Sequence, residues 1–383
     1  MGEYLFILGK NHELSTAEIV AYLESRNVDF SIADHTEMFV IVSADGLPKD
    51  MPSDLGGIIK FGEVLSSGGN VNEIINSLDE IDIGADFPEK GLFVVSSYGA
   101  GSTEEIGRKL KARLKSMGLK AGLLKHNSPT VSHTEVVRRG LEGREFLLCK
   151  GGGWWFGRTT TAHNPFEFQK RDVKRPEQRV KLSMPPRLAR IMLNMSGLKG
   201  KGKVLDPLCG LGTIPQEGVL MGYVMYGSDV DEEAVKACKD NMKWLKQNYD
   251  IKPPEIARMD ARRLSWPDGH FDAIVTEPVL GPPLKSYPKI KQAEAIVRKL
   301  EPLYRDSIKE LVRVLKTGGR LVMTSPMFRV HNEIYRIDIE AIAKEAGASE
   351  IDPLEGRMQH DFPLNDFEDR HRTLREVHIL VKG

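Results

Sequence analysis

Acidic residues and glycines stand at the ends of successive predicted strands in the second half of the sequence. Gly210 and Gly212, in the run DPLCGLGT, let the backbone approach a ligand closely where their loop enters a helix. Asp229 ends the next strand, 19 residues beyond Gly210, where a carboxylate can accept both hydroxyls of a ribose. Asp260 ends the third strand and could accept a hydrogen bond from an adenine amine, beside the backbone N–H of Ala261. Together these positions favour a site for an adenine nucleoside.

The fourth strand, FDAIVT, is followed by an acidic and proline-rich turn that places Glu277 directly before Pro278. An exocyclic amine of a base such as guanine is a poor nucleophile because its lone pair is delocalised into the ring. A carboxylate and the next backbone carbonyl can accept hydrogen bonds from the amine and stabilise the positive charge that grows on nitrogen during transfer. Pro278 has no N–H and stiffens the turn, so its carbonyl is free to accept. Glu277 and Pro278 therefore offer two adjacent acceptors after the fourth strand.

A nicotinamide-dependent dehydrogenase is the rival interpretation of the glycine loop. Asp206, at the end of the first strand, and Asp229 fit that class as well. However, the third glycine of the dehydrogenase pattern would stand at position 215, which is Pro215. A dehydrogenase also has no use for an acidic, proline-rich turn after the fourth strand. Taken singly, these acids are more typical of surface caps, but their order along successive strands favours a ligand site.

The elements that must position these residues alternate along residues 181–383, which we expect to form one domain. Strand patterns KVLD, YGSD, EIAR, FDAIVT and RLVMTSP alternate with helical patterns, the longest from about 289 to 315. This alternation predicts a doubly wound parallel sheet, in which ligands bind beyond the carboxyl ends of the strands. Ser183 is the predicted cap of the first helix, whose first turn tolerates Pro185 and Pro186.

The first 160 residues show strand and helix patterns that predict a separate region of mixed α/β structure. Ser15 or Thr16 is expected to cap a helix in the run STAEIVAYLESR. Residues 161–180 lose periodicity and carry two prolines, which indicates a linker. The chain is therefore expected to hold two folded parts joined by a short basic connection.

The net charge of zero hides an uneven distribution along the chain. Residues 1–100 hold 5 Lys/Arg against 17 Asp/Glu, residues 101–190 hold 20 against 8, and the remainder holds 29 of each. A basic middle region is suited to binding a phosphate backbone, although it is equally typical of a solvated face without a partner. The candidate RNA-binding residues are Arg108, Lys109, Lys111, Lys115, Arg138, Arg139, Lys170, Arg171, Arg175 and Arg179.

Composition indicates a globular protein of the reducing cytoplasm. Hydrophobic residues make up 40% and charged residues 28% of 383 residues, and no apolar run approaches the roughly 20 residues that span a bilayer. The first residues lack the features of a signal peptide. Cys149, Cys209 and Cys238 match no zinc or disulfide pattern, and His126 and His133 are too isolated to suggest a metal site.

The motifs DPLCGLGT, SDVD, MDAR and FDAIVTEP resemble those of class I S-adenosylmethionine-dependent methyltransferases that act on exocyclic amines. The run RPEQRVKLSMPPRLARIMLNMSG and the opening YLFILGKNHELSTAEI resemble the family of tRNA guanine-N2 methyltransferases that modify position ten. The resemblance covers nearly the whole chain and is strongest over 171–281. It implies an N-terminal THUMP-like RNA-binding region and a Rossmann-like, seven-stranded methyltransferase domain closed by an antiparallel strand at LREVHILVKG.

The resemblance also implies roles for single residues. Asp206 and Thr213, together with the two glycines of the loop, would line the methionine end of S-adenosyl-L-methionine. Asp229 would hold the ribose, with Val230 beside the adenine. The carboxylate of Asp260 and the backbone N–H of Ala261 would contact the adenine edge. Glu277 and Pro278 would hold the substrate amine. Some members of the family depend on a small activating protein partner.

The strand-four turn departs from the family pattern, which has Asp or Asn followed by two prolines and an aromatic residue. Val279 stands after Pro278, so the aromatic side chain that stacks on the flipped base is missing, and Tyr287 is a candidate substitute. The leading hypothesis is an active tRNA guanine-N2 methyltransferase that forms N2-methyl- or N2,N2-dimethylguanosine. The alternatives are a DNA adenine or cytosine amino-methyltransferase and a non-catalytic tRNA-binding protein with a degenerate site.

Overall fold

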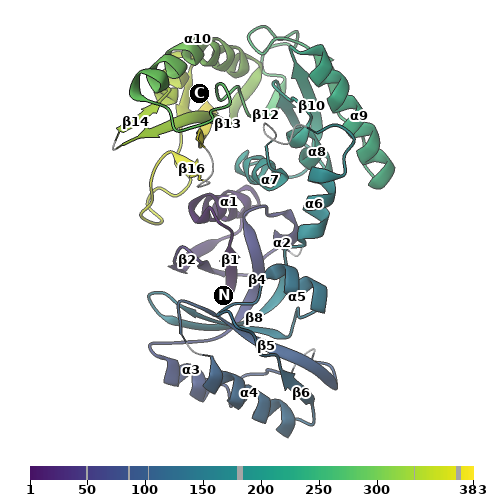
Figure 1. Ribbon diagram of the computed structural model, residues 1–383, viewed down its shortest axis with the longest axis vertical. Helices are drawn as coiled ribbons and strands as arrows, with labels where there is room; N and C mark the ends of the chain where they lie inside the picture. Colours follow the sequence, from purple (N-terminus) through teal and green to yellow (C-terminus); the bar gives the residue numbers. More distant parts are fainter. Residues whose placement is uncertain (49–50, 85–86, 102, 179–183, 332, 368–371) are drawn as a thin grey trace. The chain divides into compact units, whose positions relative to one another are not determined.

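Figure 1 shows the chain as a computed structural model that divides into two compact units. The structure describes residues 1–48, 51–84, 87–101, 103–178, 184–331, 333–367 and 372–383. The first unit consists of Met1–Thr16 and Asn27–Glu167, and the second of Ala17–Arg26 and Phe168–Gly383. Within the described ranges, no helix is long and apolar enough to cross a membrane.

The first unit is built on a mixed sheet of eight strands in the order β2-β3-β1-β4-β8-β7-β5-β6. Neighbours from β2 to β7 are antiparallel, whereas β5 is parallel to both β7 and β6. The strands are β1 (Gly2–Leu8), β2 (Phe30–His35), β3 (Phe39–Ala44), β4 (Ile58–Gly68), β5 (Lys90–Tyr98), β6 (Lys120–Leu123), β7 (Glu145–Lys150) and β8 (Trp154–Ala162). The helices are α2 (Met51–Asp54), α3 (Val71–Ser77), α4 (Glu104–Ser116) and α5 (His133–Arg139), and α1 (His12–Ser25) begins in this unit. The predicted mixed α/β fold of the N-terminal region is confirmed.

A buried ion pair lies at the centre of this first sheet. Lys60 on β4 and Glu145 on β7 form a salt bridge, and both side chains are fully buried. The Lys60 ammonium also donates to the carbonyl of Val131 at 2.7 Å. Ser96 and Thr159 donate their hydroxyls to the two carboxylate oxygens of Glu145, at 2.5 and 2.8 Å. Burial of two charges is tolerated here because their remaining donors and acceptors are engaged.

The cap predicted for the first helix is wrong. Helix α1 begins at His12, three residues before Ser15. Ser15 donates its hydroxyl to the carbonyl of Asn11 at 2.8 Å, and Thr16 donates to the carbonyl of His12 at 2.9 Å. Hydroxyls inside a helix commonly bond back to the carbonyl four residues earlier, and the sequence pattern does not distinguish this from capping.

The second unit contains the predicted seven-stranded arrangement, with the strand order β11-β10-β9-β12-β13-β17-β15 and two short strands, β14 and β16, paired at its margins. Strands β9 to β13 are mutually parallel, and β17 is antiparallel to β13. This confirms the predicted closing strand at the C-terminus. The strands are β9 (Lys203–Asp206), β10 (Val224–Asp229), β11 (Glu255–Arg258), β12 (Phe271–Thr276), β13 (Leu315–Val330), β14 (Glu333–Arg336), β15 (Ala348–Glu350), β16 (Leu364–Asp366) and β17 (Leu374–Lys382).

Helices cover this second sheet, as the alternating pattern predicts. They are α7 (Pro186–Met195), α8 (Thr213–Leu220), α9 (Glu232–Asn248), α10 (Ile290–Val314) and α11 (Ile339–Glu345). Apolar side chains of α10 and α11 form one core cluster with alternate residues of the central strands, such as Leu205, Ile274 and Leu321. Helices α7, α8 and α9 pack on the same sheet but contribute no residue to that cluster. The residues of the candidate site follow the carboxyl ends of β9, β10, β11 and β12.

The segment expected to be an irregular linker contains a helix, α6 (Pro165–Val173). Pro165 is its first residue, where proline is tolerated because the missing N–H has no partner within the helix in any case. Arg171, near the end of α6, is buried and forms an ion pair with Glu217 on α8. Ser183, the predicted cap of the next helix, lies outside the described residues.

Candidate active site

The loop after β9 adopts the backbone geometry that its glycines allow. Gly210 and Gly212 have φ angles of +49° and +86°, in the left-handed region that side chains disfavour. A Cβ atom on Gly212 would lie 2.6 Å from the sulfur of Cys238, so this glycine is required for packing against α9. A Cβ atom on Gly210 would meet nothing within 4 Å. Gly210 therefore faces open space, which a ligand can approach.

Asp229, at the end of β10, is held beside this loop. One carboxylate oxygen accepts the backbone N–H of Gly210 at 3.0 Å, and the other accepts that of Asp231 at 3.0 Å. A carboxylate offers about four acceptor positions, so two remain in this half-buried side chain. The arrangement suits a ligand that donates two hydroxyls. Val230 follows with an exposed apolar side chain.

Asp206, at the end of β9, is buried beneath the loop. Its carboxylate accepts the hydroxyl of Thr276 at 2.8 Å and the backbone N–H of Leu208 at 3.3 Å. Burial raises the pKa of Asp206 to about 7, against the lowering effect of these hydrogen bonds, and the negative charges of Asp229 and Glu277 raise it further. A cation bound nearby would favour the ionised form.

Asp260 follows β11 and is already engaged by a neighbouring cation. Its carboxylate accepts hydrogen bonds from Nε of Arg262 at 3.0 and 3.2 Å and from Nη2 of the same side chain at 2.6 Å. These hydrogen bonds lower the pKa of Asp260. An adenine amine would therefore share this carboxylate with Arg262. Ala261, the predicted backbone donor, has a buried side chain.

Glu277 follows β12 and is held by an arginine that sequence analysis missed. The Nε of Arg375 on β17 donates to Oε2 of Glu277 at 2.6 Å, and both side chains are largely buried. Asp366 lies 3.5 Å from the same guanidinium. Within the described ranges, no hydrogen bond engages Oε1 of Glu277 or the carbonyl of Pro278. The two acceptors predicted for the amine therefore retain open positions.

The loop after Glu277 is fixed from α10. Buried Tyr304 donates its hydroxyl to the carbonyl of Val279 at 3.2 Å. Burial raises the pKa of Tyr304 well above its ordinary value, so this hydroxyl remains a donor. Val279 and Tyr287 are both exposed, and the guanidinium carbon of Arg372 lies 4.4 Å from the centre of the Tyr287 ring. An aromatic ring is thus present in the loop, at a later position than in the family pattern.

Helix α4 separates an apolar face from a basic one. Ile106, Leu110 and Leu114 of α4 are buried in the first unit's core, which leaves Arg108, Lys111 and Lys115 exposed. Lys109 forms an ion pair with Asp79 at 2.7 Å. On α5, Arg139 is paired with Glu135 at 2.8 Å, whereas the guanidinium carbon of exposed Arg138 lies 6.0 Å from the centre of the Phe166 ring.

Other predicted RNA contacts lie in the interior or outside the described residues. Arg171 and Arg175 are 5% and 2% exposed, and Arg175 donates to the hydroxyl of Thr213 at 2.9 Å. Their burial corrects the expectation that these two guanidinium groups contact RNA. The ammonium of Lys170 lies 4.9 Å from the centre of the Tyr249 ring, and Arg179 lies outside the described residues.

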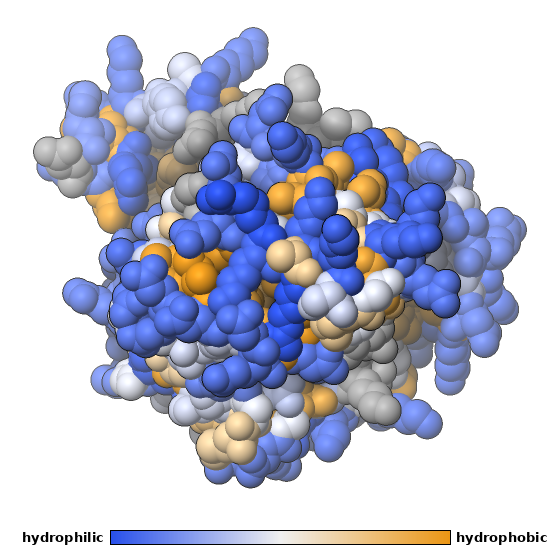
Figure 2. Space-filling view, turned by 90° about the horizontal axis from the view of Figure 1, so that it is seen from below, coloured by the Kyte–Doolittle hydropathy of each residue, from blue (hydrophilic) through white to orange (hydrophobic). Residues whose placement is uncertain are grey.

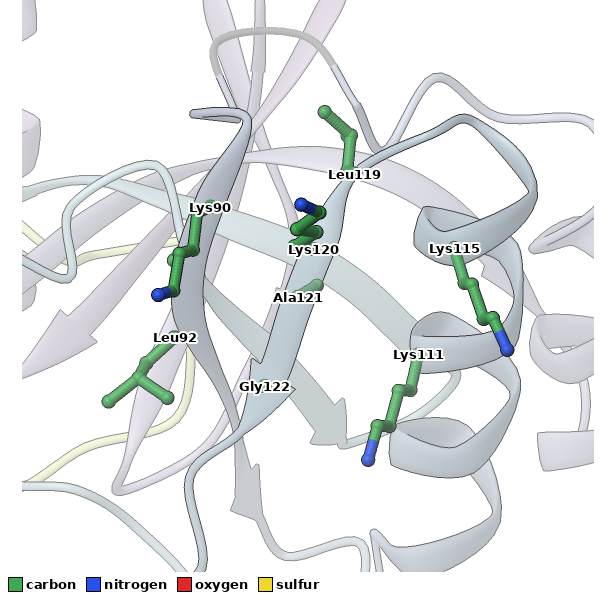
Figure 3. A pocket seen from close by; sticks show the side chains of 9 residues that line it. Lys90, Leu92, Lys111, Lys115, Leu119, Lys120, Ala121 and Gly122 are labelled. Carbon is green, nitrogen blue, oxygen red and sulfur yellow. The ribbon is translucent and has the colours of Figure 1, made fainter.

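Sequence analysis also missed Lys90 of the first unit. Figure 3 shows Lys90 on β5 and Lys120 on β6, which line a cavity of about 670 Å³ together with Lys111 and Lys115 of α4. The face of the molecule drawn in Figure 2 is mainly hydrophilic, with small hydrophobic patches. Lys90 stands in the acidic part of the sequence, so charge counting over long windows does not reveal it. One feature of the sequence could have indicated Arg375. It is a charged residue within an apolar strand, and such a residue is buried only when it is paired.

The match to known families agrees with this geometry. Residues 175–346 match the family model described as "UPF0020: RMKL-like, methyltransferase domain". This segment is a methyltransferase domain, which confirms the predicted enzyme class and, with it, S-adenosyl-L-methionine as the methyl donor. The strand order and the reversed β17 described above are those expected of that class.

Relatives with curated names extend the similarity to almost the whole chain. The chain is 28% identical over 355 residues to the tRNA (guanine(10)-N2)-dimethyltransferase of Methanothermobacter thermautotrophicus, covering 90% of this chain and 92% of that protein. It is 25% identical over 330 residues to the enzyme of the same name from Pyrococcus abyssi, covering 84% and 88%.

Solved structures support the fold across both units. TrmN from Thermus thermophilus matches with a TM-score of 0.54 and 16% identity, covering 100% of both chains. A possible methylase from Clostridium difficile 630 matches with a TM-score of 0.52 and 14% identity, covering 100% of this chain and 98% of that one.

The residues around the β9 loop fit the methyl donor. Gly210 leaves open space beside the loop, and Asp229 is oriented by backbone donors with acceptor positions to spare. Asp206 supplies a buried carboxylate near the same loop. These are the groups that an adenosine ribose and a methionine ammonium require.

Proposed function

We propose that this chain methylates the exocyclic N2 of a guanosine in tRNA, most specifically the guanosine at position ten, with one or two methyl groups. The observation that carries the proposal is the pair of open acceptors, Oε1 of Glu277 and the carbonyl of Pro278, at the end of β12. The choice of tRNA and of this amine is supported by the names of relatives that match most of the chain.

Side chains of the strand ends would hold the cofactor. Asp229 would accept the ribose hydroxyls, and Val230 would contact the adenine with its exposed apolar side chain. Asp260 and the backbone of Ala261 would read the adenine edge, and Asp206 would face the methionine end, where Gly210 and Gly212 allow close approach. Bound S-adenosyl-L-methionine would supply an electrophilic methyl group.

Glu277 and Pro278 would act on the substrate amine as hydrogen-bond acceptors. Their oxygens would orient the amine and stabilise the positive charge that develops on N2 as its lone pair is donated. Arg375 would fix one oxygen of Glu277, which leaves the other for the amine. Because the carboxylate is paired, we infer that it acts as an acceptor, with the N2 proton leaving to water after transfer.

The exposed cations of the first unit would bind the RNA backbone. Lys90, Lys111, Lys115 and Lys120 surround one cavity, and Arg108 is exposed on the same helix as two of them. Phosphate contacts of this kind position an RNA without reading its sequence. The two buried arginines, Arg171 and Arg175, are no part of this proposed surface.

The experiment is methyl transfer from labelled S-adenosyl-L-methionine to unmodified tRNA transcripts, followed by nucleoside analysis. We expect N2-methylguanosine or its dimethyl form, loss of both when the guanosine at position ten is replaced by adenosine, and no label in duplex DNA. A Glu277→Ala variant that binds cofactor but loses most methyl transfer is the matched control. Label in DNA but not in tRNA, or label on another atom of tRNA, contradicts the proposal.

Two further parts of the proposal concern the cell. We place the protein in the cytoplasm, which is supported by three buried cysteines that form no disulfide. We also propose a small activating protein partner. In that case the pure chain should bind both tRNA and cofactor but transfer methyl groups only after cell extract is added. Full turnover by the pure chain alone removes the partner from the proposal.

A further inference from the structure

A second basic cavity lies in the methyltransferase unit, beside the loop that follows Glu277. Its volume is about 590 Å³, and its lining residues are Tyr287, Pro288, Lys289, Ile290, Lys291, Arg329, Val330 and His331. The lining holds three cations and a histidine and no acidic residue. Within the described part of the chain, no ion pair neutralises the side chains of Lys289, Lys291 or Arg329. The cavity therefore presents positive charge to solvent.

Two arginines that flank the start of β17 connect this cavity to the catalytic turn. Arg375 donates to Glu277, and the guanidinium carbon of Arg372 lies 4.4 Å from the centre of the Tyr287 ring. Three residues of chain span at most about 11 Å between Cα atoms. Glu277 and Tyr287, a lining residue of the cavity, are thus both contacted by one short segment of the chain.

We propose that this cavity binds the phosphates of the RNA strand that carries the target guanosine, with the exposed Tyr287 ring contacting a base of that strand. The inference builds on the proposed function and assigns it an RNA-binding site within the catalytic unit. Tyr287 is 59% exposed, so its ring is accessible to a base even with Arg372 on part of its surface.

RNA is favoured by the combination of groups. Lysine ammonium groups bind phosphate as point charges, and an adjacent aromatic ring gives a base a surface for stacking. A flipped-out nucleotide also requires its flanking phosphates to be held while its base occupies the catalytic site. Free inorganic phosphate would use the lysines and the arginine but not the ring.

The charge test compares two double variants on and beside α10. Lys289→Ser with Lys291→Ser removes two cations from the cavity, whereas Arg298→Ser with Lys299→Ser removes two cations of the same helix that do not line it. At matched salt, we expect the first variant to raise the KM for tRNA about 10-fold and to reduce the slope of log affinity against log salt by roughly 1 to 2. The second variant should stay within about twofold of the wild type, and both should bind S-adenosyl-L-methionine normally.

The ring test compares Tyr287→Phe with Tyr287→Ala. The phenylalanine variant keeps the stacking surface and should retain the affinity for tRNA, whereas the alanine variant should weaken it about 10-fold. The inference is overturned if the two double variants change the affinity for tRNA equally. It is also overturned if Tyr287→Phe and Tyr287→Ala change that affinity equally. Inorganic phosphate that competes with tRNA at millimolar concentration only in the wild type and not in the Lys289/Lys291 variant supports the phosphate assignment.

These outcomes separate the inference from the proposed function. If the wild type transfers methyl to tRNA while the cavity variants behave like their controls, only the cavity assignment fails. If the wild type transfers no methyl group, but the cavity variants bind tRNA more weakly than their control variants do, the RNA-binding site stands and the proposed reaction fails.

Discussion

At the scale of single residues, Glu277 differs from the family's usual Asp or Asn in length and in how it is held. The extra methylene brings the carboxylate to Arg375, which reaches from the last strand to the catalytic turn. An ionised carboxylate in a largely buried position requires such a partner, because an unpaired charge there would be costly. Glu277 is thus paired with an arginine of the same unit.

We predict that Arg375 affects turnover more than binding of the cofactor. Arg375→Met should lower kcat on the order of 100-fold, because the substitution removes the charge-assisted hydrogen bond that fixes the orientation of Glu277. Arg375→Lys should recover part of that activity, since an ammonium can still pair with the carboxylate. Steady-state kinetics with tRNA, combined with the Kd for S-adenosyl-L-methionine, measure both effects. A Met variant with unchanged kcat would show that the ion pair is only structural.

Asp206 makes the free energy of unfolding depend on pH. Its raised pKa determines whether that free energy rises or falls with pH. The folded protein holds this proton up to about pH 7, whereas an ordinary Asp releases it near 3.8. Its stabilising contribution is therefore complete below about pH 4 and disappears as the pH rises through 7, a change on the order of 4 kcal/mol. Asp206→Asn removes this dependence.

The measurement is urea unfolding of wild type and Asp206→Asn between about pH 4 and 8 without cofactor. The stability of the wild type relative to the variant should fall as the pH rises towards 7. Parallel curves for the two proteins would contradict a raised pKa. With cofactor bound, the fall should be smaller, because a nearby ammonium favours the ionised carboxylate.

At the scale of elements, the first sheet depends on an ion pair that joins β4 to β7. We predict that Lys60→Met destabilises the first unit by about 3–5 kcal/mol, because it leaves the Glu145 carboxylate buried without its charge partner. The double variant Lys60→Met with Glu145→Leu should be markedly more stable than Lys60→Met alone. Thermal or urea unfolding of the full chain, followed by a signal from this unit, gives the comparison.

Helices α10 and α6 show which helices can be predicted from the sequence and which cannot. The long α10 (Ile290–Val314) agrees with the predicted range because its apolar period is regular over many turns. Helix α6 was missed because Pro165 and a run of charged residues hide its short apolar face. Its buried Arg171 is acceptable only because Glu217, 46 residues later, is placed opposite it by the fold.

At the scale of the whole molecule, the net charge of zero conceals a basic surface in the first unit. We predict that tRNA affinity falls steeply with salt, and that removing one phosphate-binding cation reduces the slope by roughly 0.7–0.9. Lys111→Ser with Lys120→Ser should reduce it, since both line the cavity of Figure 3. Filter binding or fluorescence titration at several salt concentrations provides the slopes.

Lys109 and Arg139 provide the matched controls for that experiment. Both are paired with acids of their own unit, so Lys109→Ser and Arg139→Ser should change the slope less than the cavity variants do. If all four substitutions change the slope equally, binding reflects the general charge of the unit and no particular surface.

The sequence by itself determined the class of fold and the strand ends that carry the candidate site, because period-two and helical patterns are local and ligands bind at the carboxyl ends of parallel strands. The methyltransferase function followed from the resemblance of the motifs to a known family. Only the tertiary structure decided which cations face solvent, since Lys111 and Arg171 look alike until Glu217 is placed beside one of them. It also decided how Glu277 is held, because its partner Arg375 is 98 residues away and is brought to it by the pairing of β17 with β13.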